Sequence, residues 1–296
     1  MALTLSLFEW PRNCCFGNRS APLPALPHPI QPVVFGPAPG CTHNAGSHKT
    51  ALQSATDSEW SASTSTAPMT TPAVFREQTI DRERMQQIIA AHPRAATFEA
   101  CTLDGGDFSR LDMDGFHFSQ CSMAGARWLA ASLEESHWQK CRGGHCDFSS
   151  AQLGDSRFTH CDLNNSHWRR ATLSSVQFQD CKLTGAQLQE VTGWALEFRD
   201  CLLVSADLRG LSFRKGKLEG LDFSDADLSG CDFRDAMFSG GSLRNAQTRL
   251  TRFEGADLRD TDISGLNVMD AKYFKKAVIS QRQAAAALAA FGLIVA

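Results

Sequence analysis

The chain has 296 residues, of which 43% are hydrophobic and 21% charged, and its formal net charge is −3 at neutral pH. These values are typical of a folded globular protein and argue against a wholly disordered chain. No apolar run reaches the ~18 residues that a membrane span requires, which argues against a transmembrane protein. The apolar start of the chain lacks a basic region and a small-residue cleavage site, so it is a poor secretory signal.

Ten of the eleven prolines lie before residue 75, among residues rich in Ser, Thr and Ala. Such a composition predicts that residues 1–75 are a disordered extension. Met69 opens a segment that looks like an ordinary protein start, so a gene-model artefact over residues 1–68 stays an open alternative. Residues 76–95 follow as an N-terminal cap, in which we expect a short helix over 79–91.

From Phe98 to Val268, every fifth residue belongs to one series. Of its 35 positions, 32 are large and apolar, and the exceptions are Gly143, Gly193 and Thr248. A second series, two residues earlier, is small at 29 of 35 positions. A period of five fits neither a helix nor a flat strand, but four pentads can close a square coil. The cysteines support this period, since six of them recur at every fourth pentad: Cys101, Cys121, Cys141, Cys161, Cys181 and Cys201.

The cysteines are interpreted as small apolar fillers of the coil interior, not as disulfides or metal ligands. Six unpaired thiols indicate a reducing compartment, and therefore the cytoplasm. The nine histidines are dispersed, and we find no catalytic constellation, phosphate-binding loop or metal-ligand spacing. We therefore expect a binding protein without a cofactor, and not an enzyme.

The complete pattern, an Asp followed by the large apolar residue and then by mostly polar or small residues, is seen in the pentads DLSGC, DFRDA, DLRGL and DFSDA. They resemble the pentapeptide repeat proteins, whose signature is A(D/N)LXX. The resemblance implies an all-β fold, a right-handed quadrilateral β-helix over residues 96–270 with nearly nine coils. At ~4.8 Å per coil, the repeat would be on the order of 40 Å long.

Residues 271–296 are interpreted as a C-terminal helix and apolar tail. Ser280 and Gln283 form the pattern of a capping box, Gly292 marks the helix end, and the chain closes in LIVA. This ending resembles that of the Qnr and MfpA proteins and the self-immunity proteins McbG and AlbG. The resemblance implies an end-to-end homodimer with contacts at Ala287, Leu288, Phe291, Leu293, Ile294 and Val295. The alternative is that the helix only caps its own coil.

Residues 96–270 contain 26 acidic and 18 basic residues, a net charge of −8 that the whole chain conceals. The resemblance implies that this acidic rod mimics DNA, binds DNA gyrase or topoisomerase IV without binding DNA or a membrane, and protects the enzyme from an antibiotic. A quinolone and a peptide-type gyrase poison, including one made by the host itself, both stay open. The candidate contact residues are Asp180, Asp200, Asp222, Asp225, Asp227, Asp232, Asp235, Asp257, Asp260 and Asp262.

Two observations keep a second class of function open. Asp is also the favoured turn residue of the repeat, so its abundance has a purely structural explanation. A uniform DNA mimic would also not need basic spots, and this chain has two: Arg169-Arg170 and Arg214-Lys215-Lys217. The alternative is a generic pentapeptide-repeat scaffold or effector that mediates protein–protein interactions.

Overall fold

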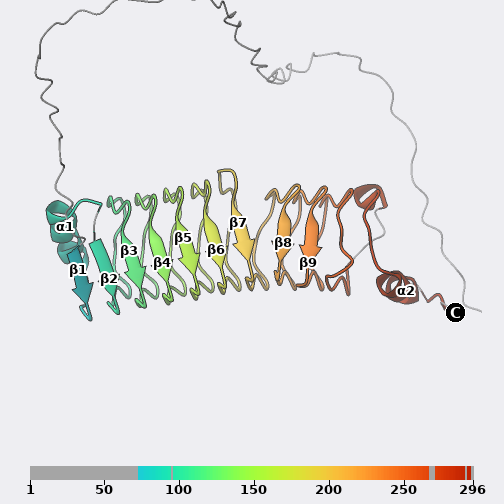
Figure 1. The fold of residues 1–296 in the computed structure, drawn as a ribbon, viewed down its shortest axis with the longest axis horizontal. Coiled ribbons are helices and arrows are strands. Elements are labelled where there is room, and N and C mark those ends of the chain that lie inside the picture. The colour runs from blue at the N-terminus through green and yellow to red at the C-terminus, as the bar shows by residue number, and fades with distance from the viewer. Residues whose placement is uncertain (1–72, 95, 267–270, 291, 295–296) are drawn as a thin grey trace, which may run out of the picture. The chain divides into compact units, whose positions relative to one another are not determined.

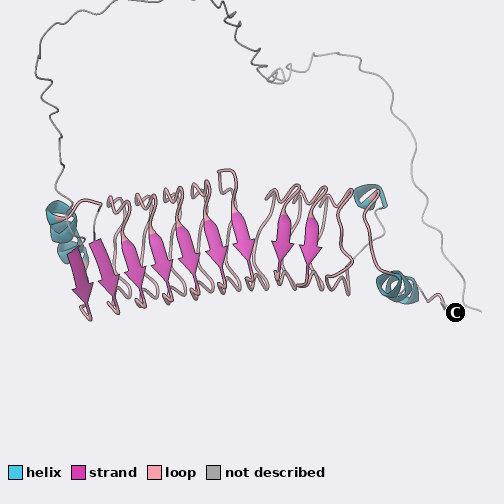
Figure 2. Cartoon of the chain, viewed as in Figure 1, coloured by secondary structure: helices cyan, strands magenta, loops and turns pink. Residues whose placement is uncertain are grey.

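The computed structural model describes residues 73–94, 96–266, 271–290 and 292–294. Nine parallel strands stack in chain order into one sheet and build a β-solenoid of about eight turns (Figures 1 and 2). The predicted all-β solenoid is confirmed. The strands are β1 (Ala73–Arg76), β2 (Ala96–Glu99), β3 (His117–Ser119), β4 (His137–Gln139), β5 (Arg157–Thr159), β6 (Gln177–Gln179), β7 (Glu197–Arg199), β8 (Lys217–Glu219) and β9 (Met237–Ser239).

Each coil takes four pentads, as the cysteine spacing predicted. Strands β2 and β3 pair in parallel with Phe98 opposite Phe118, and the same offset recurs along the sheet. We call the side with the strands face 1. Faces 2, 3 and 4 follow in chain order and pair through single bridges, such as Thr102↔Ser122, Asp107↔Arg127 and Asp112↔Ser132. Four pairing positions per coil make the solenoid quadrilateral.

The interior is filled by stacked side chains of the large series. On face 1, the rings of Phe118 and Trp138 stack with their centroids 4.0 Å apart, and Trp128 from face 3 meets Trp138 edge-on at 5.2 Å. All three side chains are buried. Offset stacks and edge-to-face pairs are the arrangements that aromatic rings prefer. The large series therefore holds adjacent coils together through a continuous aromatic core.

The corners of the coil require an unusual backbone conformation. The second residue after each large one commonly adopts a positive φ, as at Asp180 (53°), Asp225 (59°) and Asn245 (55°). Gly, Asn and Asp tolerate this left-handed region better than other residues. The polar character of the corners thus follows from the turn as well as from solvent exposure.

The N-terminal end is closed by helix α1 (Arg82–Ala91), which begins after the N-cap Asp81. Met85 and Ile88 of this helix are buried in the core that includes the first coil. The described structure starts at Ala73, before the expected start of the cap at residue 76. Strand β1 pairs with β2, and Phe75 stacks on Phe98 at 5.5 Å. This strand lies outside the pentad series, so the repeat could not predict it. Residues 1–72, which belong to the predicted disordered extension, lie outside the described residues.

The C-terminal end also differs from the predicted boundary at residue 270. The 3-10 helix Ala271–Phe274 and the residues after it add a further partial coil: Phe253 N–H donates to Tyr273 O at 2.8 Å, and Leu258 N–H donates to Val278 O at 2.8 Å. Phe274 stacks on Phe253 at 4.9 Å. The donor and acceptor residues of these bonds are one position further apart in the sequence than in the other coils. The segment therefore does not follow the pentad register, and the register could not predict it. The intervening residues 267–270 lie outside the described part.

Helix α2 (Gln281–Ala290) follows and confirms the predicted capping box. Ser280 N–H and Oγ–H donate to Gln283 Oε1 at 2.6 and 2.8 Å. Gly292, with φ 78°, ends the helix; its N–H donates to Ala289 O and that of Leu293 donates to Leu288 O, the pattern of a Schellman motif. Neither helix of the described residues is long and apolar enough to cross a membrane.

Candidate functional site

Half of the predicted acidic contact residues gather along one edge of the solenoid. Asp180, Asp200 and Asp260 occupy the corner between faces 1 and 2, directly after their face 1 segments. Asp222 and Asp262 lie on face 2, two coils apart on the same bridge ladder. We call these five residues the acidic edge. None of them is buried, and among the described residues none lies within 4.0 Å of a Lys or Arg nitrogen.

Local hydrogen bonds stabilise the charged form of part of this edge. Asp262 accepts from Ser264 N–H at 2.9 Å and from the Ser264 hydroxyl, and the side-chain bond from Ser264 lowers the pKa of Asp262 below its ordinary value. Asp180 is paired only with His160, whose Nδ1 lies 3.6 Å away. Within the described part of the chain, the acidic edge therefore carries negative charge without a Lys or Arg in direct contact.

The other five predicted residues are scattered over the remaining faces. Asp257, on face 1, and Asp232, on face 4, pair with Arg259 and Arg234, and hydrogen bonds from these arginines lower the pKa of each carboxyl group. Asp227, on face 3, lies 3.6 Å from an Arg209 nitrogen. The remaining two stand at different corners, Asp225 between faces 2 and 3 and Asp235 between faces 4 and 1. The ten residues thus do not form one continuous site.

The predicted dimer contacts lie on the last helix and the tail. Leu288, Leu293 and Ile294 are 41%, 56% and 96% exposed, and Ala287 is half-buried. Phe291 and Val295 lie outside the described residues. Helix α2 is anchored to its own solenoid, since Gln283 Nε2 donates to Leu258 O and Thr261 O, both at 2.7 Å. Leu288 on this anchored helix, and Leu293 and Ile294 just after it, therefore expose apolar side chains.

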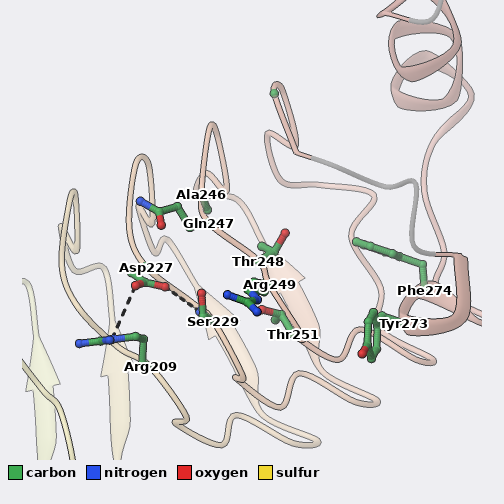
Figure 3. A pocket seen from close by; sticks show the side chains of 11 residues that line it. Arg209, Asp227, Ser229, Ala246, Gln247, Thr248, Arg249, Thr251, Tyr273 and Phe274 are labelled. Atoms are coloured by element: carbon green, nitrogen blue, oxygen red, sulfur yellow. Dashed lines mark hydrogen bonds and ion pairs between the residues drawn. The ribbon is translucent and has the colours of Figure 1, made fainter. Parts of the chain in front are cut away.

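The solenoid wall is hollowed at two of the three positions where the large series fails. At Thr248, a cleft of about 620 Å³ opens near the C-terminal end, with Arg209, Gln247 and Tyr273 among its lining residues (Figure 3). At Gly193, a larger cleft of about 840 Å³ is lined by Trp194, Arg214 and Lys217 and others. We call these the Thr248 cleft and the Gly193 cleft. Sequence reasoning singled out both residues as irregular but did not predict a cavity.

The two basic spots also differ in a way that the sequence could not show. Arg169 and Arg170 both bind Glu190 from the next coil, at 3.1 and 2.8 Å. Arg214, Lys215 and Lys217 have no acidic oxygen within 4.0 Å among the described residues. The coil period would have revealed the first pairing, because Arg170 and Glu190 share one corner position in successive coils.

The described residues contain no cluster of three or more His, Cys, Asp or Glu side chains that could hold a metal ion. The eight cysteines in the described ranges are buried and free. Cys141 and Cys146, which stand close in the sequence, each donate to a different backbone carbonyl, of Phe118 and Met123. Their role in the structure is to fill small spaces between coils.

Comparisons with known proteins agree with this architecture. A model of the pentapeptide repeat family matches eight copies, at residues 130–165, 151–189 and 206–245. No curated protein sequence matches the chain significantly. A trypsin-treated variant of QnrB1, described as a plasmid-mediated fluoroquinolone resistance protein, is 20% identical with a TM-score of 0.54, over 67% of this chain and 99% of that one.

A second solved structure is more distant. HetL from Nostoc sp. strain PCC 7120, a pentapeptide repeat protein involved in heterocyst differentiation regulation, is 19% identical with a TM-score of 0.28, over 69% of this chain and 84% of that one. At 20% identity the likeness to QnrB1 concerns the fold alone. The family match shows that residues 130–189 and 206–245 carry pentapeptide repeats, and the pentad series and the coil of four pentads extend the same pattern over the other coils.

Proposed function

We propose that the chain is a cytoplasmic binding protein, not an enzyme, that occupies the DNA-binding surface of DNA gyrase or topoisomerase IV and so protects the enzyme from an antibiotic. The observation that carries the proposal is the acidic edge. The antibiotic is a quinolone or a peptide-type gyrase poison, and in the second case the protein serves as self-immunity of the producer.

The charge pattern supports binding to a surface that normally holds DNA. Successive coils are ~4.8 Å apart, so Asp180 and Asp200 place two negative charges one coil apart on one edge, and Asp260 returns to the same corner three coils later. Duplex DNA also carries regularly spaced negative charge along its axis. A basic surface that holds DNA attracts such an edge, and salt weakens the attraction. Among the described residues, no Lys or Arg nitrogen lies within 4.0 Å of these carboxylates, so they can pair with cations of a partner.

The likeness to QnrB1 supports the same assignment at the level of fold. That protein is described as a fluoroquinolone resistance protein, and nearly its whole length aligns with two thirds of this chain. The apolar residues after Ser280 support a homodimer in which two solenoids join through their C-terminal helices. A partner would cover the side chains of Leu288, Leu293 and Ile294, which are otherwise left in water.

The proposal is tested with a gyrase supercoiling assay, with and without ciprofloxacin or a peptide-type poison. We expect the protein to inhibit supercoiling or to restore activity in the presence of one poison, and 300 mM salt to weaken the effect. The triple variant Asp200→Asn, Asp222→Asn, Asp260→Asn should lose at least tenfold in potency. Asp232→Asn is the matched control, because Asp232 lies on face 4 and is paired with Arg234.

An unchanged potency of the triple variant would remove the acidic edge as the contact. If the wild-type protein affects neither gyrase nor topoisomerase IV with any poison, the protective function itself is excluded. The scaffold function then takes its place.

The dimer is tested independently by sedimentation of the full chain. We expect the wild type to sediment as a dimer at micromolar concentration and Leu288→Asp to sediment as a monomer. Leu250→Asp is the control, because Leu250 is a 58% exposed leucine far from α2 in the sequence. A monomeric wild type would show that α2 serves only its own solenoid.

A further inference from the structure

The wall of the solenoid is open at Gly193, where the order of large and small residues is reversed. Gly193 stands in the large series, while Val191 and Leu196 stand in the small one. The φ of Gly193 is 128°, and a Cβ there would come within 2.7 Å of Ser174 N. The backbone therefore approaches the preceding coil closely and leaves no side chain to fill the interior on face 4.

The irregular segment also interrupts the hydrogen-bond ladder. Among the described residues, no backbone bond joins 191–196 to 211–217, although this pairing recurs in other coils. Between β7 and β8, only Arg199 and Glu219 are in register. The chain leading into β7 projects beyond the neighbouring turns, and β7 and β8 stand further apart than the other strands (Figure 1). The Gly193 cleft of about 840 Å³ occupies this interruption.

The floor of the Gly193 cleft is apolar. Leu196 and Leu211 are only half-buried here, whereas most residues of the small series are fully buried. Phe198 and Phe213 retain 5% and 6% exposure, in contrast to the ring of Phe158, which is inaccessible. A volume of this size falls within the usual range of small-molecule sites, ~300–1,000 Å³. The cleft can therefore receive an apolar body of drug-like size.

The rim of the cleft is positively charged, in contrast to the acidic solenoid around it. Arg214, Lys215 and Lys217 line it and have no acidic partner within 4.0 Å among the described residues. Arg199 also lines it but is paired with Glu219, and Glu197 is the one carboxylate among the lining residues. Three cations without partners beside an apolar floor are suited to an anionic group on an apolar ligand.

Trp194 is one of the lining residues of this cleft. Its side chain is 72% exposed, whereas Trp128, Trp138 and Trp168 are fully buried in the core. The backbone beneath it is held in place, because Ser175 N–H donates to Trp194 O at 2.8 Å. An indole on a fixed backbone offers a flat surface on which a planar ring can stack.

We propose that the Gly193 cleft binds an organic anion with a planar aromatic body, such as an aromatic carboxylate. The aromatic body lies on Leu196, Leu211 and Trp194, and the carboxylate is bound by Arg214 and Lys217. This site is separate from the acidic edge, so it adds a small-molecule binding activity to a chain otherwise built for a macromolecular contact.

The proposal is tested by isothermal titration of the full-length protein with 2-naphthoate. We expect saturable one-site binding, and at least tenfold weaker binding of the uncharged 2-naphthamide. Arg214→Gln and Lys217→Gln should each weaken 2-naphthoate binding by about tenfold, equal to about 1.4 kcal/mol. Arg244→Gln is the matched control, an exposed arginine outside the cleft without an acidic partner among the described residues. Circular dichroism establishes that each variant keeps the fold.

Several results would overturn the proposal. They are the absence of 2-naphthoate binding to the folded wild type, equal loss in Arg244→Gln, and full competition by inorganic phosphate, which would indicate a site for the charge alone. Preferential binding of a poly-glutamate peptide would assign the cleft to an acidic protein segment instead. None of these measurements involves gyrase, so they stand apart from the test of the protective function.

Discussion

The thiols of the solenoid occupy a repeating and confined position between two coils. Cys161 Sγ lies 3.3 Å from Trp138 O in the preceding coil and 3.5 Å from Thr159 O in its own strand segment. The side chain is 1% exposed. The neighbouring thiol of Cys141, with burial, raises the pKa of Cys161 to about 12, and burial raises that of Cys146 to about 12. These groups are therefore fillers with little thiolate at neutral pH.

We expect the native protein to protect these thiols from alkylation. The thiolate is the nucleophile, and a pKa near 12 leaves very little of it at pH 8. Iodoacetamide at pH 8 should leave Cys141, Cys146 and Cys161 unmodified for hours and modify them within minutes in 6 M guanidinium chloride. Peptide mass spectrometry resolves each cysteine. Rapid labelling of Cys161 in the folded protein would contradict the stacked geometry.

A second residue-scale prediction concerns two adjacent glycines. Gly240 and Gly241 have φ values of 73° and 75°, but their surroundings differ. A Cβ at Gly240 meets nothing within 4 Å, whereas one at Gly241 overlaps the backbone carbonyl of Leu221. We expect Gly240→Ala to cost about 1 kcal/mol of unfolding free energy and Gly241→Ala about 3 kcal/mol. Denaturant titration followed by circular dichroism measures both; equal losses would show that backbone conformation alone matters.

At the scale of elements, Gln283 has two functions in one side chain. Its oxygen accepts from Ser280 and completes the capping box, and its amide nitrogen donates to Leu258 O and Thr261 O of the last described coil. The capping box was predictable, because it depends only on residues three apart. The anchor was not, because it depends on two carbonyl groups that lie more than a full coil earlier in the chain.

We expect Gln283→Ala to release α2 from the solenoid, because two hydrogen bonds of about 1 kcal/mol each are lost. Hydrogen exchange of the amides at 284–289 should accelerate by roughly tenfold or more. Gln283→Glu should act similarly, since its carboxylate can accept from Ser280 but places negative charge against two carbonyl oxygens. Gln281→Ala, on the exposed side of α2, should leave the exchange rate unchanged. Acceleration in Gln281→Ala alone would refute the anchor.

At both ends of the solenoid, the sequence predicted the existence of the elements better than their bounds. A short helix was expected over residues 79–91, and α1 covers Arg82–Ala91 with Asp81 as its N-cap. Strand β1 is held by pairing with β2, which follows only after α1 in the chain, and Phe274 by stacking on Phe253 across a shift of one position. Both contacts join residues that are far apart in the sequence and do not follow the period of five, so no local sequence pattern predicts them.

Across the whole solenoid, the period of five determines the fold with little ambiguity. Each coil meets only its neighbours, so stability is a sum of coil terms and interface terms. The function was less predictable. The acidic residues could be listed from the sequence, but their grouping could not. Only the structure shows that Asp200 and Asp222 share the acidic edge, whereas Asp232 lies on face 4 and is paired with Arg234.

The interface interrupted at Gly193 should be the weakest in the solenoid. The amides of Ser212 and Lys217 lack the backbone acceptors that Gln152 and Arg157 find three coils earlier, at 2.9 Å each. We expect hydrogen exchange at 212 and 217 to be at least a hundredfold faster than at 152 and 157. The same experiment should show the coils on either side opening as separate units. Uniform protection across this interface would mean that the cleft closes in solution.

The offset of four pentads between paired coils has a consequence for how such a protein changes its length. Removal of four successive pentads, such as 141–160, takes out one coil and leaves every later residue on its former face. Removal of a single pentad turns all later faces by a quarter of the circumference. A deletion of this kind within 180–262 would split the acidic edge between two sides, and α2 would point its apolar residues in a new direction. Duplication or loss of whole coils is therefore the change of length that keeps every later residue on the same face of the solenoid.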